Sequence, residues 1–384
     1  MVKRDIENTI KKLINQYPVV TLTGPRQSGK TTLLRSIFKE FPYVNLENPD
    51  TRQLALDDPR GFLNNFPQGA ILDEVQNAPE LFSYIQVMVD DNKDLRFILS
   101  GSHNFLLLEN ISQSLAGRAA ILKLLPFSIH ELYKNNITSN YESVIFNGLF
   151  PGIYDRNLEP SIFYSSYINT YLERDVRQIK KIGDLHQFSG FLRLVAGRVG
   201  QLLNLNSLAT DAGISPNTVK AWLSILEASY IIHYLPPFHK NFNKRITKAP
   251  KLYFSDTGLV CSLLGIENEK QVKTHYAKGA LFENMIINEF LKARYNRGLT
   301  SNLYYWNNKN LYEIDLILES GNKTTAIEIK SGMTLQKEYF KNLKYWQKLS
   351  GESPENCYVI YGGKENYSTG KGSFVSWQDL HKVT

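Results

Sequence analysis

A glycine-rich segment near the amino end constrains the fold of this chain more than any other feature. Residues 23–34 read TGPRQSGKTTLL and follow the apolar run 19–22, which fits the spacing GxxxxGK[ST]. A strand, this loop and a helix predict a phosphate-binding site, because glycines let backbone N–H groups wrap phosphate oxygens, the lysine neutralises phosphate charge and the threonine hydroxyl binds Mg²⁺. The alternative is a glycine turn before an ordinary helix. We expect a nucleoside triphosphate to be bound by Gly24, Pro25, Arg26, Gln27, Ser28, Gly29, Lys30, Thr31 and Thr32.

A second segment supplies the acids that such a site needs. Residues 70–74 read AILDE, an apolar strand that ends in two carboxylates. We expect Asp73 to hold Mg²⁺ together with Thr31, and Glu74 to polarise the attacking water, because adjacent residues at a strand end can serve both purposes. Taken alone, an Asp-Glu pair of this kind is more often a solvated strand end. The phosphate-binding loop upstream favours hydrolysis over simple binding.

Two further polar residues are candidates for catalysis, beside Lys30 and Glu74. Ser100 follows the predicted strand 95–99 and could sense the γ-phosphate, with His103 and Asn104 as substitutes. The alternative is that serine and glycine only form the turn. Arg118 precedes the predicted strand 120–124, and its planar, permanently charged guanidinium suits transition-state stabilisation in its own subunit or in a neighbouring one. Its alternative is an exposed loop arginine.

Composition favours a multidomain protein with an anionic partner. At about 150 residues per domain, 384 residues indicate two or three domains. The net charge of +7 and the pI near 9.0 favour nucleic acid. Cys261 and Cys357 are far apart and have no metal-binding spacing, so neither a zinc site nor a disulfide framework is expected. No apolar run approaches the roughly 18 residues of a membrane helix, so we expect a cytoplasmic protein without a membrane partner. A homo-oligomer remains open.

Residues 207–223 predict a helix-turn-helix. A short helix, a glycine turn and a Ser-Pro helix start are followed by a second helix that presents Asn217, Thr218, Lys220 and Ser224. Residues 230–237 then predict the first strand of a wing. We expect a basic wing tip, formed by His239, Lys240, Lys244, Arg245, Lys248 and Lys251. Such a module either contacts DNA or packs as a rigid unit between domains.

The last third of the chain carries a second group of chemical residues. Glu283 lies on a predicted helix, Asp315 and Glu328 lie on predicted neighbouring antiparallel strands, and Lys330 shares a strand face with Glu328. Three carboxylates could share Mg²⁺ while the lysine orients or deprotonates water, which suits phosphodiester hydrolysis. An ExK triplet alone is usually ordinary salt-bridge chemistry. The order of a helical Glu followed by D…ExK resembles the PD-(D/E)XK nucleases.

Together these motifs resemble those of prokaryotic AAA-type P-loop ATPases with a restriction-endonuclease-like C-terminal domain. The resemblance rests on TGPRQSGKTTLL, AILDEVQ, SGS at 100–102, SLAGRAAILKLLPFSIHEL, LFPGIYD at 149–155 and YLERDV at 171–176. The last motif could contact nucleotide or a neighbouring subunit, although a salt-bridged solvated face is favoured.

The resemblance implies an α/β fold with four parts. A P-loop NTPase parallel sheet forms the AAA-type ATPase core in residues 1–140, and a helical lid follows in 141–203. A winged helix-turn-helix in 204–255 precedes a PD-(D/E)XK nuclease-like domain in 256–384. The expected function is a Mg²⁺-dependent ATPase, with ATP and Mg²⁺ as cofactors, that is coupled to a nuclease-like domain acting on DNA. The alternative is a nucleotide-controlled switch or interaction protein whose nuclease-like domain does not cleave.

Overall fold

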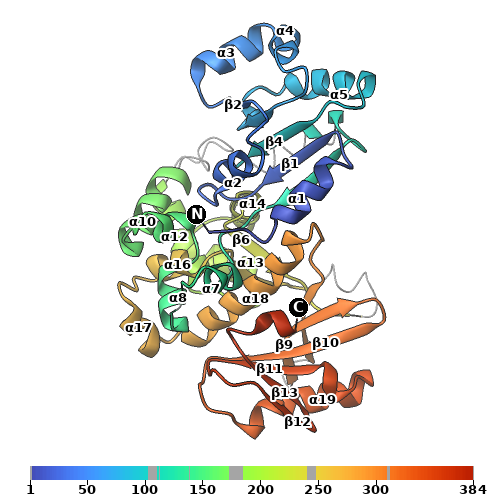
Figure 1. Cartoon of the computed structure of the whole chain (residues 1–384). Coiled ribbons are helices and arrows are strands. Elements are labelled where there is room, and N and C mark those ends of the chain that lie inside the picture. The colour runs from blue at the N-terminus through green and yellow to red at the C-terminus, as the bar shows by residue number, and fades with distance from the viewer. Residues whose placement is uncertain are drawn as a thin grey trace. The chain divides into compact units, whose positions relative to one another are not determined.

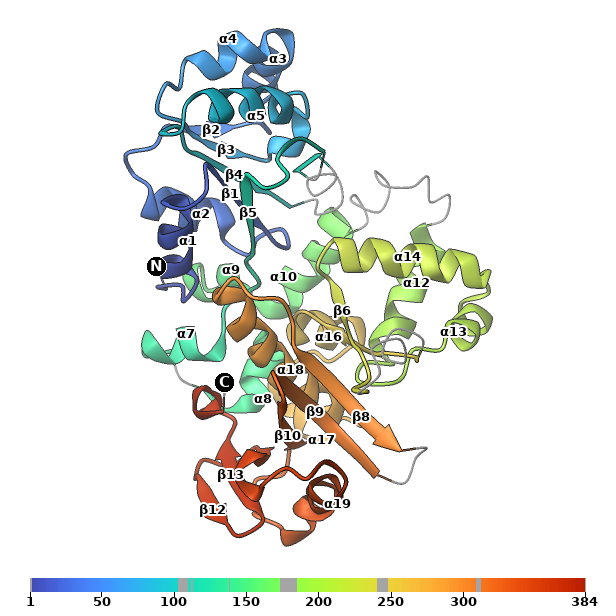
Figure 2. The same ribbon diagram turned by 90° about the vertical axis from the view of Figure 1, so that its right-hand side faces the viewer.

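The chain divides into two compact units (Figures 1 and 2). The computed structural model describes residues 2–102, 110–111, 113–137, 139–172, 185–239, 248–308 and 312–383. Unit 1 contains Met1–Phe127, Ala228–Tyr230 and Arg294–Thr300, and unit 2 contains Ser128–Glu227, Ile231–Ala293 and Ser301–Thr384. The chain therefore returns twice to the first unit after leaving it.

Unit 1 is built on a parallel five-stranded sheet. Its strand order is β2-β3-β4-β1-β5. The strands are β1 (Val19–Thr23), β2 (Tyr43–Asn45), β3 (Ile71–Asp73), β4 (Phe97–Gly101) and β5 (Ala119–Lys123). Parallel strands end at the same edge of a sheet, so the loops after β1, β3 and β4 converge. The predicted mixed α/β class with a parallel P-loop-type sheet is confirmed.

Helices cover both faces of this sheet, because the strand side chains are apolar on both sides. One face packs against α1 (Glu7–Ile14) and α2 (Lys30–Ile37), with Val20 and Leu22 of β1 in that core. The other face packs against α3 (Pro49–Asp57), α4 (Pro59–Asn64) and α5 (Leu81–Asp91), with Val19 in that core. A 3₁₀ turn, η1 (Val75–Asn77), follows β3. Strand β1 is buried along its whole length.

The first half of unit 2 is helical. Its elements are α7 (Ile129–Lys134), α8 (Tyr141–Asn147), α9 (Pro151–Asp155), α10 (Pro160–Tyr167), the π-helix η2 (Ile168–Leu172), α12 (Leu185–Ala196), α16 (Thr257–Leu263), α17 (Glu269–Thr274) and α18 (Lys278–Asn296), whose last residues belong to unit 1. Residues 173–176 of the YLERDV motif lie outside the described residues.

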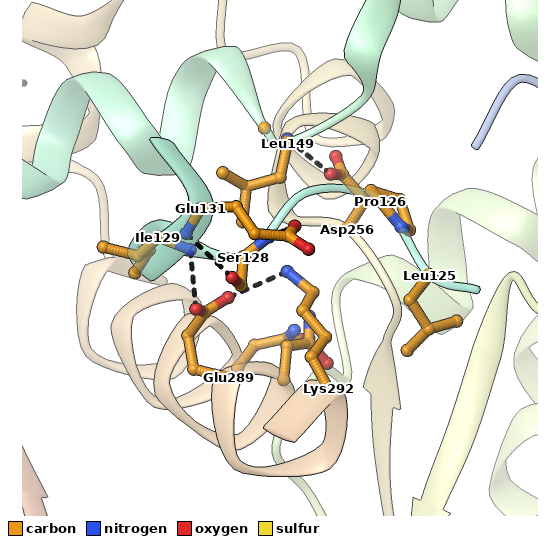
Figure 3. Close-up of polar contacts among 12 residues, drawn as sticks. Leu125, Pro126, Ser128, Ile129, Glu131, Leu149, Asp256, Glu289 and Lys292 are labelled. Carbon is orange, nitrogen blue, oxygen red and sulfur yellow. Dashed lines mark hydrogen bonds and ion pairs between the residues drawn. The ribbon is translucent and has the colours of Figure 1, made fainter. Parts of the chain in front are cut away.

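Buried charges hold α7 against α18 (Figure 3). Glu289 on α18 accepts a hydrogen bond from the Ile129 backbone N–H at 2.6 Å and pairs with Lys292 at 2.8 Å. Ser128 and Glu131 form a capping box at the start of α7. Burial raises the pKa of Glu289, and the neighbouring Lys292 opposes that shift. The segment that follows the parallel sheet, from Ser128 onward, thus packs within unit 2.

Two helices and a pair of antiparallel strands lie between α12 and α16 in the chain. Helix α13 (Leu205–Ala212) ends at a left-handed glycine, Gly213, and α14 (Pro216–Ala228) follows. Strands β6 (Ile232–Leu235) and β7 (Lys251–Phe254) are antiparallel. On α14, Asn217, Lys220 and Ser224 are exposed, whereas Thr218 is half-buried and its backbone N–H donates to the capping hydroxyl of Ser215 at 3.0 Å.

The expected basic wing tip is corrected at one position. Lys251 is buried in β7 and pairs with Glu283 and Glu313, so it is not a tip cation. The basic residues near Lys251 in the sequence favour an exposed position at the tip. The carboxylates that bury Lys251 instead are distant in the sequence, so the local pattern does not reveal them. Lys240, Lys244 and Arg245 lie outside the described residues, Lys248 is exposed and His239 is half-buried.

The end of unit 2 forms a six-stranded sheet with the order β12-β13-β11-β10-β9-β8. Strands β8, β9 and β10 are antiparallel neighbours, and β10-β11 and β11-β13 are parallel pairs. The elements are β8 (Leu303–Asn308), β9 (Tyr312–Ser320), β10 (Lys323–Lys330), η3 (Lys337–Phe340), α19 (Lys341–Ser350), η4 (Pro354–Asn356), β11 (Cys357–Tyr361), β12 (Tyr367–Thr369), β13 (Gly372–Ser376) and η5 (Leu380–Lys382).

Helix α19 packs on this sheet through a core that includes Leu343, Trp346 and Phe374. The described residues include no helix with both the length and the apolar content that a bilayer span requires.

Candidate functional site

The glycine-rich loop connects the end of β1 to the start of α2. Gly24 has φ +150°, and a Cβ there would lie 2.1 Å from the carbonyl oxygen of Leu124. Gly29 has φ +91° at the N-cap of α2. Both positions therefore require glycine, one for space and backbone conformation and the other for conformation. The loop precedes the N-terminus of α2, where backbone N–H groups and the helix dipole favour an anion.

Hydrogen bonds from two basic side chains to backbone carbonyl oxygens hold this loop. The ammonium of Lys30 donates to the carbonyl oxygens of Gly24 and Pro25, at 3.0 and 2.9 Å. The buried Arg4 donates to the Ser28 carbonyl oxygen at 3.0 Å and to that of Leu125 at 2.7 Å, so it ties the loop to the segment after β5. The Ser28 hydroxyl is buried, and no hydrogen-bond partner is found for it among the described residues.

Asp73 is the centre of a hydrogen-bond network at the end of β3. Its Oδ2 accepts from the Thr31 hydroxyl at 2.6 Å and from the Tyr43 hydroxyl at 2.9 Å, and its Oδ1 accepts from Ser100 at 2.5 Å. Burial, followed by the charge of Asp73, raises the pKa of Tyr43, so the phenol stays a donor. A hydroxyl and a carboxylate side by side are the oxygen ligands that Mg²⁺ prefers. Thr31 and Asp73 therefore fit this ion.

Glu74 has an unusual backbone conformation for a residue other than glycine. Its φ is +54° and its ψ is +44°, a left-handed conformation of the kind that costs roughly 1–3 kcal/mol and often occurs at functional sites. Its carboxylate accepts from Gln76 Nε2 at 2.5 Å and from the Ser102 hydroxyl at 3.1 Å. Ser100, the predicted sensor, contacts Asp73, and Ser102 contacts Glu74. The substitutes His103 and Asn104 lie outside the described residues.

Arg118 lies at the opposite end of the sheet from the loop. It precedes β5, and β5 runs parallel to β1 with Ala119 beside Val19 and Lys123 beside Thr23. The amino end of β5, where Arg118 lies, is therefore four strand residues, roughly 13 Å, from the carboxyl end of β1, where the loop starts. Its guanidinium forms a two-pronged ion pair with Asp90, both contacts at 2.7 Å, which lowers the pKa of Asp90 and raises that of Arg118. The structure therefore does not bring Arg118 to the phosphate site of its own subunit.

In unit 2, Lys330 joins two of the carboxylates that the sequence singles out. Its ammonium lies 2.7 Å from Glu328 Oε2 and 3.1 Å from Asp315 Oδ2. Burial raises the pKa of Glu328 to about 8, and the charge of Asp315 adds to the shift. Burial lowers the pKa of Lys330, but the two carboxylates outweigh it and raise the pKa above its ordinary value.

The pairing of β8 with β9 shifts register between Tyr304 and Trp306, opposite Asp315 and Leu316. Tyr304 pairs with Ile317 and Trp306 with Ile314, so two steps on β8 face three steps on β9. Bulges turn a side chain to a new direction and are common beside active sites. The Asp315 carboxylate accepts from the Ile329 backbone N–H at 2.7 Å, which fixes it beside β10.

Glu283 is held by other partners. Its Oε1 accepts from Lys251 at 3.2 Å and from the Tyr253 hydroxyl at 2.5 Å. Burial raises the pKa of Glu283, Lys251 opposes the shift and the charge of Asp315 adds to it. Within the described ranges, no three side chains of His, Cys, Asp or Glu are placed to hold a metal ion together.

Four residues near the phosphate site were not singled out from the sequence. They are Arg4, Tyr43, Gln76 and Ser102. Gln76 and Ser102 lie within the motifs AILDEVQ and SGS, so their spacing from Glu74 and Ser100 was a usable signal. Arg4 and Tyr43 carry no local signal, because the fold alone brings them to the loop and to Asp73.

Family models match three consecutive parts of the chain. An AAA domain matches residues 16–133, a domain of unknown function (DUF8612) matches 138–270 and another (DUF4143) matches 278–380. Unit 1 thus contains an AAA domain, which is a P-loop ATPase fold. The two other models carry no functional description.

Relatives cover most of the chain. The uncharacterized proteins Mb2031c of Mycobacterium bovis and Rv2008c of Mycobacterium tuberculosis are each 31% identical over 338 residues, 86% of this chain and 74% of theirs. The uncharacterized protein MJ1544 of Methanocaldococcus jannaschii is 26% identical over 358 residues, 84% of this chain and 76% of its own. Among solved structures, the Walker-type ATPase PABY2304 of Pyrococcus abyssi has a TM-score of 0.46 at 17% identity and covers 68% of this chain and 96% of that one.

Proposed function

The chain belongs to the same family as the two mycobacterial proteins, and from this premise and its AAA domain we propose that it is a Mg²⁺-dependent ATP hydrolase. The observation that carries the proposal is the 2.6 Å hydrogen bond between Thr31 and Asp73. It joins the first turn of α2 to the end of β3, so Thr31 and Asp73 together would hold a Mg²⁺ ion that supplies charge neutralisation at the phosphates.

The chain's own residues divide the work at this site. Backbone N–H groups of the loop and the ammonium of Lys30 bind the phosphates. Thr31 and Asp73 would hold Mg²⁺, which supplies charge neutralisation for the phosphoryl group when it is bound. Asp73 is kept in place by Tyr43 and Ser100, which donate to its carboxylate.

Glu74 is the proposed residue that orients and activates water. It follows Asp73 directly, and its backbone is left-handed at the point where β3 ends. Gln76 and Ser102 donate to its carboxylate and restrict its position. A positioned carboxylate of this kind contributes about 10²–10⁴-fold to a rate.

Two substitutions test these assignments separately. We expect Lys30→Ala to weaken binding of a fluorescent ATP analogue by about 10- to 100-fold, because it removes charge-assisted hydrogen bonds worth roughly 1.5–3 kcal/mol. We expect Glu74→Gln to bind the analogue normally and to lower the rate of phosphate release by about 10²-fold or more. Lys39→Ala, at an exposed lysine near the end of α2, is the matched control. Normal turnover in both site variants would refute the proposed site.

The second part of the proposal concerns the end of unit 2, which we infer to be a nuclease-like domain that acts on DNA under control of the ATPase. The supporting observations are the order of its elements, with α18, the antiparallel strands β8 to β10, α19 and then the parallel strand β11. The register shift opposite Asp315 and Leu316 and the position of Lys330 between Asp315 and Glu328 fit a hydrolytic cluster. ATP binding and hydrolysis would change how the helix-turn-helix segment and this domain engage DNA.

The second candidate is a nucleotide-controlled switch whose C-terminal domain does not cleave. One observation favours it: Glu328 has a pKa near 8 and Glu283 is occupied by Lys251 and Tyr253, so the carboxylates are not arranged as a ready metal site. Metal-dependent DNA cleavage distinguishes the two candidates.

A further inference from the structure

A row of lysines follows the exposed face of helix α19. Lys341, Lys344 and Lys348 are all exposed, and at about 3.6 residues per turn they fall within an arc of about 60°. They span about 10 Å along the helix axis. Lys337, four residues before Lys341 on η3, is exposed as well. The sequence of α19, KNLKYWQKLS, contains no acid.

The lysines are crowded by a further cation from the sheet. Lys371, in the turn between β12 and β13, is the largest cause of a lowered pKa at Lys344, with burial next and Lys348 contributing as well. Gln347 donates to the Lys371 backbone carbonyl at 2.9 Å, which fixes the turn against α19 (Figure 1). Like charges that are held together repel one another, so a bound anion would relieve this repulsion.

Aromatic stacking fixes the orientation of this helix. Tyr345 stacks on Tyr312 with ring centroids 4.0 Å apart and an interplanar angle of 5°, and Trp346 packs edge-on against Trp306. Leu343 and Trp346 are buried in the core. The lysine row is therefore presented on a rigid support, which lowers the entropic cost of binding.

The helix also touches the cluster that contains Lys330. Asn342, on the turn between Lys341 and Tyr345, donates to Glu328 Oε1 at 3.3 Å. The lysine row lies on a different face of α19 from Asn342, and a strand bound along the row would be held by the same helix that contacts Glu328.

We propose that Lys341, Lys344, Lys348 and Lys371 bind the backbone phosphates of a nucleic-acid strand and hold it on the domain that carries the Asp315, Glu328 and Lys330 cluster. This proposal rests on the proposed action of the C-terminal domain on nucleic acid. It names the surface that holds the strand. Lysine contacts to phosphates release counterions, so affinity falls as salt rises.

The test measures binding of the full chain to fluorescent single-stranded and duplex oligonucleotides by anisotropy, from about 50 to about 200 mM salt. The lysine-row variant carries Lys341→Gln, Lys344→Gln and Lys348→Gln. The control changes three exposed helical lysines elsewhere by the same charge, namely Lys12→Gln, Lys270→Gln and Lys273→Gln. Far-UV circular dichroism and melting curves confirm that both variants are folded.

We expect the lysine-row variant to lose about 2.7 units of the log–log salt slope on duplex and about 2.1 units on single strands, at about 0.9 and about 0.7 per contact. The control should keep the wild-type slope. If the wild type binds and the lysine-row variant has the same slope, the lysine row is refuted and the proposed function stands. A wild type without salt-sensitive binding refutes both the row and the nucleic-acid part of that function.

One more arm separates nucleic acid from a membrane surface. Met333 and Leu335, shortly before α19, are exposed, so a basic surface here could also meet anionic lipid. Vesicles of phosphatidylcholine and phosphatidylserine are therefore offered to the same proteins. The nucleic-acid proposal is overturned if the lysine-row variant loses vesicle binding while its oligonucleotide binding is unchanged.

Discussion

Gly24 offers the sharpest test of the loop geometry. In Gly24→Ala the new Cβ would lie 2.1 Å from the Leu124 carbonyl oxygen, and the backbone would keep a φ of +150° that an alanine rarely adopts. Gly117, at φ +76° and with open space within 4 Å of the point that a Cβ would occupy, is a matched control in the same unit. Alanine at positive φ carries a conformational cost of about 1–2 kcal/mol at Gly117 and at least as much at Gly24. Only Gly24→Ala adds overpacking, typically about 1–3 kcal/mol.

The expected results follow from this difference. Chemical denaturation should show Gly24→Ala destabilised by about 2–5 kcal/mol and Gly117→Ala by about 1–2 kcal/mol. The loop must move to relieve this overlap, which displaces the groups that bind the phosphates. Gly24→Ala should therefore also lose nucleotide affinity by about 100-fold or more, while Gly117→Ala binds nucleotide normally. Equal destabilisation with normal nucleotide binding in both variants would refute the contact between the loop and Leu124.

The remaining predictions concern the cluster in unit 2. Burial raises the pKa of Glu328 to about 8, so the contribution of this group to stability is fully present below its ordinary pKa of 4.5 and is lost as pH rises through about 8. In EDTA, the melting temperature of the wild type should therefore fall more steeply between about pH 6 and about pH 9 than that of Glu328→Gln. Parallel melting curves for the two proteins would contradict this prediction. We expect DNA cleavage in the presence of Mg²⁺ or Mn²⁺, tested on linear, branched and supercoiled DNA with and without ATP. Lys330→Ala should lower the cleavage rate by about 100-fold. Lys323→Ala, at an exposed lysine on the same strand, should leave the rate unchanged. Absence of both cleavage and salt-sensitive DNA retention in the wild type would favour the switch.

The predictable part of this protein is the part encoded locally. The phosphate-binding loop needs glycines, a lysine and a hydroxyl within a few residues, and the acids Asp73 and Glu74 follow an apolar strand directly. Because the strands are parallel, the two segments meet at the same edge of the sheet, where Thr31 donates a hydrogen bond to Asp73. The antiparallel pairing that places Asp315 near Glu328 also follows from short alternating segments.

Long-range partners explain what the sequence could not provide. Tyr43 reaches Asp73 because β2 is the neighbour of β3, and a short strand of three residues carries almost no signal of its own. Lys251 stands among basic residues in the sequence, yet folding buries it between carboxylates from α18 and β9. The basic residues around Lys251 in the sequence therefore predicted an exposed side chain, but pairing with carboxylates distant in the sequence buries it.

Arg118 shows that strand direction carries information that motif spacing does not. A residue that follows a parallel strand lies at the carboxyl edge of the sheet, and a residue that precedes one lies at the amino edge. Ser100 and Asp73 end their strands and meet the loop, whereas Arg118 precedes β5 and pairs with Asp90 at the other edge. The order of residue and strand in the sequence was enough to exclude contact with the phosphates of its own subunit. Any catalytic role for Arg118 therefore requires a second copy of the chain to present the arginine to a neighbouring loop.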